Sequence, residues 1–257
     1  MPKGHSGIRR GGGSKGQAPV QATVNVPQAK TIAEANQLAV SLGLANHADF
    51  NGLDISVANE AIQELAATKA LLQISDSDSL EFIGSIANLN SQYRFRLRHG
   101  RVNAFCSRFI GNGGRFVSAI SFNEKKMSPR NINNMLKEKA ENVSARWYPL
   151  GTGILLGTVS HEIGHYLDNL YGIRNDAKIN TLFRGHKGRY RMEYEYLPNG
   201  GYRFTSKMSQ ALSEYANANI KEFIAEAWSE YRNNPSPRSL AKEVGDRIIE
   251  IARRRNP

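Results

Sequence analysis

Two histidines and a glutamate lie at a spacing that suits metal-assisted hydrolysis. His161, Glu162 and His165 form an H-E-x-x-H within the segment GTGILLGTVSHEIGHYLDNLYG. On a helix, residues four apart project from one face about one turn apart, so both imidazoles can bind one Zn²⁺. In this motif the glutamate takes a proton from a zinc-activated water. We therefore expect His161 and His165 to be zinc ligands and Glu162 to be a general base.

Zinc needs a third protein ligand, and downstream acidic residues supply candidates. Glu222, Glu226 and Glu230 lie at i, i+4 and i+8 in YANANIKEFIAEAWSE, among apolar residues. A carboxylate face on a helix of buried residue types indicates a metal or a polar network inside the protein. We expect Glu222 to be the third ligand. The longer metzincin pattern is excluded, since Asp168 and Tyr171 stand where it requires Gly and His.

Nucleophilic hydrolysis has little support in the sequence. Ser160 precedes His161 directly, and adjacent helical residues point about 100° apart, so this imidazole cannot readily serve as its base. Cys106, the single cysteine, has no base signature nearby and excludes both an internal disulfide framework and a cysteine-rich zinc cluster.

The elements that must position these residues come in segregated runs, so the expected fold class is α+β with a mixed sheet. Helical spacing and capping signals predict helices at 31–42, 56–72, 131–146, 151–171, 209–231 and 236–253. Strand patterns occur at 80–86, 93–98, 102–110 and 115–122, and a Pro-Asn-Gly-Gly turn predicts a hairpin between 189–197 and 202–206.

The charge of the 257-residue chain is strongly basic, with a net value of +11. Residues 1–28 are Gly-rich and basic, and we interpret them as a disordered tail that either docks on nucleic acid or a capsid or is merely solvated. The remainder, 29–257, is expected to be one domain with an N-terminal lobe to about 150 and a zinc-binding lobe from about 151. Neither a secretory signal nor an apolar run long enough for a membrane span is visible.

The motif HEIGHYLD, followed by Y-x6-EFxAEA, resembles zincin metallopeptidases of the anthrax lethal factor type. It is more similar still to the related domain associated with phage minor head proteins. The specific motifs cover the C-terminal half, and the N-terminal half fits more loosely through AEANQLAVSLG, GLDISVANEAIQEL, LEFIGSI and RWYPLGTG. The resemblance implies a zincin-like fold and a zinc-dependent endopeptidase, in a phage virion or the host cytoplasm.

Individual residues acquire expected roles from this resemblance. His161, His165 and Glu222 match the zinc ligands, and Glu162 matches the general base. Tyr215 matches a tyrosine that aids catalysis by hydrogen bonding near the metal. Glu226 matches an acid that contacts a ligand histidine, whereas Asp168 either orients an imidazole or lies on the helix surface. The long gap between His165 and Glu222 departs from many such enzymes, and the 198–201 hairpin is expected to fill it.

Zincin folds place an edge strand beside the zinc helix, where a peptide substrate can pair with it. The candidate edge strand is 115–122, with the sequence RFVSAISF. An alternative function of a different class also remains open. In that alternative the zinc site is only structural, and the protein is a virion component that binds capsid or nucleic acid through its basic surface.

Overall fold

The computed structural model describes residues 24–98, 100, 102–111, 114–188 and 193–255. The helices are α1 (Ile32–Ser41), α2 (Ile55–Leu72), α3 (Ile86–Tyr93), α4 (Glu124–Met127), α5 (Ile132–Ser144), α6 (Leu155–Tyr171), α7 (Ala177–His186), α8 (Lys207–Ala211), α9 (Ile220–Asn233) and α10 (Ser239–Arg255). Short 3-10 helices are η1 (Asp76–Asp78), η2 (Ile173–Asn175) and η3 (Tyr215–Asn217). The strands are β1 (Ala45–Asp49), β2 (Leu80–Ser85), β3 (Ala104–Ile110), β4 (Phe116–Phe122), β5 (Tyr194–Tyr196) and β6 (Tyr202–Phe204).

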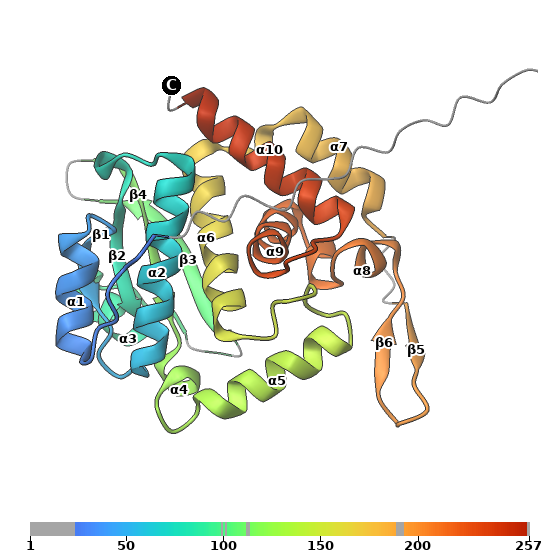
Figure 1. Cartoon of the computed structure of the whole chain (residues 1–257), viewed down its shortest axis with the longest axis horizontal. Coiled ribbons are helices and arrows are strands. Elements are labelled where there is room, and N and C mark those ends of the chain that lie inside the picture. The colour runs from blue at the N-terminus through green and yellow to red at the C-terminus, as the bar shows by residue number, and fades with distance from the viewer. Residues whose placement is uncertain (1–23, 99, 101, 112–113, 189–192, 256–257) are drawn as a thin grey trace, which may run out of the picture.

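A mixed four-stranded sheet with the order β1-β2-β4-β3 forms one side of the molecule. The strands β1, β2 and β4 are parallel, and β3 pairs antiparallel with β4. The helices α1, α2 and α6 pack on one face of this sheet, and α3 contacts the sheet through β2 and β4 (Figure 1). The expectation of an α+β fold with a mixed sheet is therefore confirmed.

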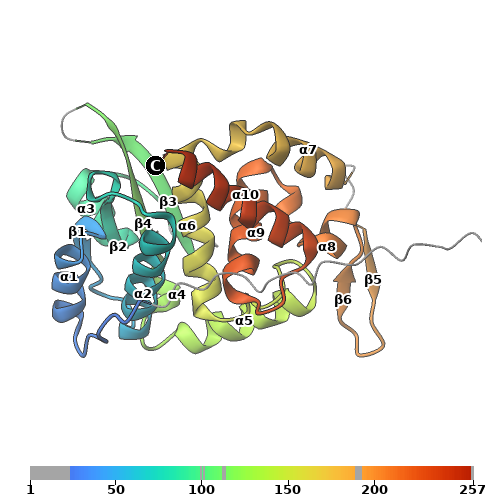
Figure 2. The ribbon, with the colours of Figure 1, turned by 45° about the horizontal axis from the view of Figure 1, so that its top comes forward.

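The helix α9 lies at the centre of the other side, with α6, α7, α8 and α10 around it (Figures 1 and 2). Its face toward α6 is buried and includes the completely buried indole of Trp228. Ser229 Oγ donates a 2.7 Å hydrogen bond to the Gly157 carbonyl of α6, which fixes the two helices along their axes. Of the helices in the described ranges, none is long and apolar enough to cross a membrane.

Most predicted elements are present with small shifts of their ends. Thr31 caps α1 as expected, because its Oγ1 accepts a hydrogen bond from the Glu34 amide. The predicted strand 93–98 is wrong, since Tyr93 ends α3 and the next residues form no strand. The alternation in this segment still has a physical origin. Phe95 and Leu97 pack against a small apolar cluster on the sheet, while the arginines between them are exposed.

Two further predictions need correction. The helix predicted at 209–231 is broken into α8, η3 and α9, and Asn219 starts α9 by capping the amides of Lys221 and Glu222. The strand β4 is not an edge strand, because β2 and β3 pair with its two sides. The edge beside α6 belongs to β3.

The first 23 residues of the predicted tail lie outside the described residues, whereas Val24 and Val26 pack against the core.

Candidate metal centre

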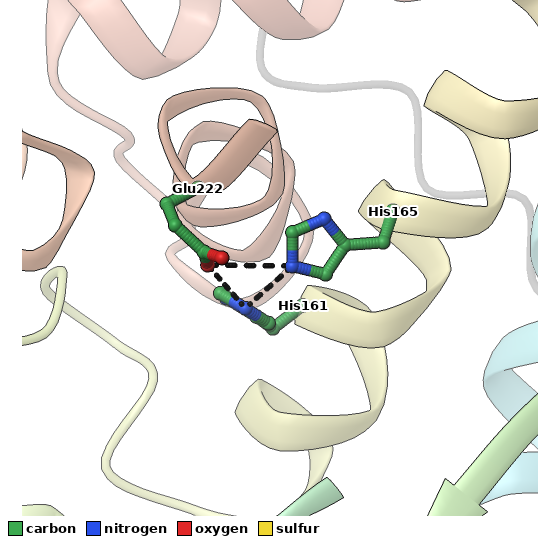
Figure 3. Close-up of side chains that lie close together, drawn as sticks. All are labelled: His161, His165 and Glu222. Atoms are coloured by element: carbon green, nitrogen blue, oxygen red, sulfur yellow. Dashed lines mark hydrogen bonds and ion pairs between the residues drawn. The ribbon is translucent and has the colours of Figure 1, made fainter. Parts of the chain in front are cut away.

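Three potential metal ligands converge at the junction of α6 and α9. His161 and His165 project from the middle of α6, and Glu222 projects from the first turn of α9 (Figure 3). A carboxylate in the first turn of a helix interacts favourably with the helix dipole. Each of the three side chains is between 13% and 17% exposed, so the site is sheltered but reachable.

The spacing of the ligand atoms fits a tetrahedral zinc ion. The two Nε2 atoms are 3.1 Å apart, and Glu222 Oε2 lies 3.2 Å from that of His161 and 3.3 Å from that of His165. Ligand atoms held at zinc distances of 2.0–2.1 Å with tetrahedral angles lie about 3.3 Å apart. Glu222 Oε2 is buried and accepts no hydrogen bond of good geometry from the described residues. The donor set and its orphaned oxygen therefore fit a bound cation.

The same contacts perturb the ionisation of the ligands. Burial lowers the pKa of His161, but the neighbouring Glu222 and Glu226 carboxylates outweigh it and raise the pKa to about 10. Burial raises the pKa of Glu222, but His161 and His165 outweigh it and hold the pKa well below its ordinary value. The carboxylate thus stays ionised, and the cluster attracts a positive charge, either a proton or a metal ion.

Glu226 lies behind His161 and fixes its orientation. Its Oε1 is 2.7 Å from His161 Nδ1, and its Oε2 accepts a 2.8 Å hydrogen bond from Ser213 Oγ. Because Nδ1 donates to this carboxylate, Nε2 is the nitrogen that faces the centre, and it binds a metal ion once its own proton is released. This carboxylate–histidine contact is the usual support of a metal-binding imidazole. The contact predicted for Glu226 is therefore present.

Glu162 lies beside the cluster and is 5% exposed. Burial raises the pKa of its carboxyl, while His161, His165 and Lys139 act in the opposite direction. A raised pKa brings a carboxylate closer to the pH at which it can take up and release a proton. Its environment therefore suits a general base.

Tyr215 is placed at the site by η3 and not by a helix shared with Glu222. Its ring stacks on the His161 ring at 6.0 Å and on the Trp147 ring at 5.8 Å. Its amide donates to the Trp147 carbonyl, which holds the two segments together. Burial and the nearby Glu222 carboxylate raise the pKa of its phenol, so the hydroxyl stays a hydrogen-bond donor. The ring of Tyr148 also packs edge-on against Tyr215.

Lys139 of α5 is a charged residue at this site that the sequence reasoning missed. It is only 5% exposed, and its Nζ lies 4.8 Å from the centre of the Tyr148 ring. Burial lowers its pKa to about 8, although Glu226 and Glu162 oppose this shift. The sequence contained a signal of this burial, because Lys139 lies on the same face of the amphipathic segment 131–146 as the apolar residues Ile132 and Met135. The structure shows that all three are buried.

Two other acidic residues lie away from the metal centre. Asp168 is buried at the end of α6, where it accepts from the Arg174 amide and forms an ion pair with the Arg174 guanidinium. It therefore orients no ligand imidazole and is not on the surface. Glu230, the third member of the acidic stripe, forms an ion pair with Arg238.

Comparison of the chain with family models, curated proteins and solved structures found no match. The resemblance to lethal-factor-type zincins therefore stays a prediction. Function has to be inferred from the residues that converge at the metal centre.

Proposed function

We propose that the protein is a zinc-dependent endopeptidase with a zincin-like fold. Zinc is proposed to be held by His161, His165 and Glu222, and the observation that supports it best is the tetrahedral spacing of their three ligand atoms. The Glu226 contact behind His161 adds independent support, because a solvent-facing pair of histidines would not need it. The phage setting rests on the resemblance alone.

The side chains around the centre have complementary roles in this proposal. A zinc ion at this site would polarise the substrate carbonyl and acidify the attacking water. Glu162 takes a proton from that water and passes it to the leaving amine nitrogen. The Tyr215 hydroxyl donates a hydrogen bond to the oxygen that gains negative charge during the attack. Glu226 holds the His161 ring in place throughout.

The strand β3 is the proposed docking edge for the substrate backbone. Within the described part of the chain it pairs only with β4, so its other side is free to pair with an extended peptide. It contacts α6, and Asn169 of α6 donates a 3.7 Å hydrogen bond to Cys106 Sγ of β3. Burial and the Glu162 carboxylate raise the pKa of this thiol, which keeps it protonated and a poor nucleophile.

Mapping of newly formed protein N-termini tests this function. A cellular proteome is treated with zinc-loaded wild-type protein or with the Glu162→Gln variant, and a chelator is added in a third arm. We expect cleavage by the wild type only, with both proteins holding one zinc per chain. Equal cleavage by zinc-loaded Glu162→Gln would contradict the mechanism. Zinc binding without cleavage in any arm would instead favour a structural zinc site.

A further inference from the structure

A cavity of about 450 Å³ is lined by Arg146, Arg203 and Arg238, and we name it the arginine cavity. Its volume falls within the range of roughly 300–1,000 Å³ that is typical of ligand pockets. Its remaining walls include the apolar side chains of Val143 and Leu212. Among the described residues, none that lines it is acidic. The cavity therefore offers positive charge in partly apolar surroundings.

Two of the three guanidinium groups are free to bind a ligand. Arg146 forms no ion pair within the described residues, and Arg203 is 4.0 Å from Glu195, where both side chains are well exposed and the pair contributes little. Arg238 is already engaged by Glu230 and by the Gln210 and Leu212 carbonyls. A free guanidinium in such surroundings binds carboxylates with two parallel hydrogen bonds.

The arginine cavity adjoins the metal centre through Tyr148. This ring lines the cavity and packs at 6.0 Å against Tyr215, which stacks at 6.0 Å on His161. The His161 and Tyr148 ring centres are thus at most about 12 Å apart, a distance that about four residues of extended peptide span. The backbone of Arg146 is tied to the same region, because its carbonyl accepts from the Glu214 amide.

Arg146 follows the end of α5, whose last turn is closed by hydrogen bonds from the Arg146 and Trp147 amides to the Val143 and Asn142 carbonyls. Its φ angle is +60°, in the left-handed region that non-glycine residues rarely adopt. A left-handed residue at this position is a common way for a helix to end, and Gln73 and Arg94 end α2 and α3 in the same conformation.

We propose that the arginine cavity binds an acidic side chain of the substrate, several residues from the cleaved bond. This inference rests on the proposed peptidase function and narrows its substrates to acidic segments of polypeptide. The carboxylate is held by Arg146 and Arg203, while its methylene groups contact Val143 and Leu212.

A proteome-derived peptide library tests the inference. The library is digested with zinc-loaded wild type, Arg146→Glu, Arg203→Glu and the control Arg130→Ala, which removes an exposed arginine from another loop. The wild type and Arg130→Ala are expected to cut peptides with Asp or Glu enriched at one fixed position. Each charge reversal is expected to reduce that enrichment at least tenfold and to favour Lys or Arg there.

The outcomes separate this inference from the proposed function. Cleavage without an acidic preference, or with a preference unchanged in both reversed variants, would overturn the cavity's role and leave the peptidase intact. If neither the wild type nor any variant cleaves the library, both the role of the cavity and the proposed peptidase function are overturned. Arg203 lies on the half-exposed face of a surface hairpin, so Arg203→Glu provides a folded variant even if Arg146→Glu is unstable.

Discussion

Gly164 and Ala225 mark the close approach of α6 and α9. A Cβ atom added to Gly164 would lie 2.7 Å from the Ala225 Cα, which is a backbone atom that cannot move alone. Gly164 lies between the two histidines of the motif, and Ala225 lies one turn after Glu222. The contact that lets the helices touch therefore also sets the distance between the histidines and the third ligand.

Gly164→Ala is expected to weaken zinc binding because it separates the two helices. Overpacking of this kind typically costs roughly 1–3 kcal/mol of stability. Thermal unfolding and zinc titration by calorimetry should both show a loss. Gly185→Ala is the matched control, since a Cβ there meets nothing within 4 Å. It is expected to leave the zinc affinity unchanged. Unaltered zinc binding by folded Gly164→Ala would argue against this role of the helix contact.

Glu226→Gln is expected to lower zinc affinity about 10- to 100-fold, because the His161 ring loses its ionised partner. Competition with a chelator of known affinity measures the change. Glu230→Gln is a control on the same helix, since Glu230 is equally buried but pairs with Arg238. It should reduce the Tm and leave the zinc affinity intact. Similar zinc affinities in the two variants would exclude a specific role for Glu226.

Tyr215→Phe is expected to keep the ring contacts with His161 and Trp147 but to lose the hydroxyl donor. Removal of one such donor typically lowers kcat about 10²- to 10³-fold. Steady-state kinetics on a cleaved peptide, with zinc content measured in parallel, check this prediction. Tyr202→Phe, on the exposed hairpin, is the control. A Tyr215→Phe enzyme as active as the wild type would remove the tyrosine from the mechanism.

The sequence predicted the parts of the site that depend on local spacing. The two histidines could be predicted as a pair because residues four apart on any helix lie on one face. Glu222 could be predicted as a ligand because acidic residues on an otherwise buried helix need a partner. The edge strand could not be chosen in this way. Whether β3 or β4 is outermost depends on the parallel pairing of Phe82 with Ala119 and their neighbours, which is a long-range contact.

Three features that were not predicted, namely the strand β1, the break before α9 and the buried Lys139, have physical reasons. The strand β1 has the sequence ANHAD, in which apolar and polar residues do not alternate. Asn46 and His47 are both exposed, and the strand is stabilised by its pairing with β2. The break before α9 depends on Ser213 and Asn219, whose side chains bond to backbone amides and compete with a continuous helix. Lys139 was missed because lysine is usually expected on the solvated face of a helix.

The buried Lys139 predicts a specific dependence of stability on pH. Its pKa is about 8 in the folded protein and near 10.4 in the unfolded chain, so between these values the unfolded chain binds more protons. Stability should therefore rise with pH across this range, on the order of 3 kcal/mol, relative to Lys139→Met. Chemical denaturation of both proteins from pH 7 to 10 measures the difference. A constant difference across that range would show that folding does not lower the pKa of Lys139.

Anomalous diffraction at the zinc edge, from crystals of the zinc-loaded protein, tests the metal centre most directly. One peak is expected between α6 and α9, about 2.0–2.1 Å from the Nε2 atoms of His161 and His165 and from a carboxylate oxygen of Glu222. A peak bound by other residues, or no peak at this position with zinc in excess, would contradict the proposed centre.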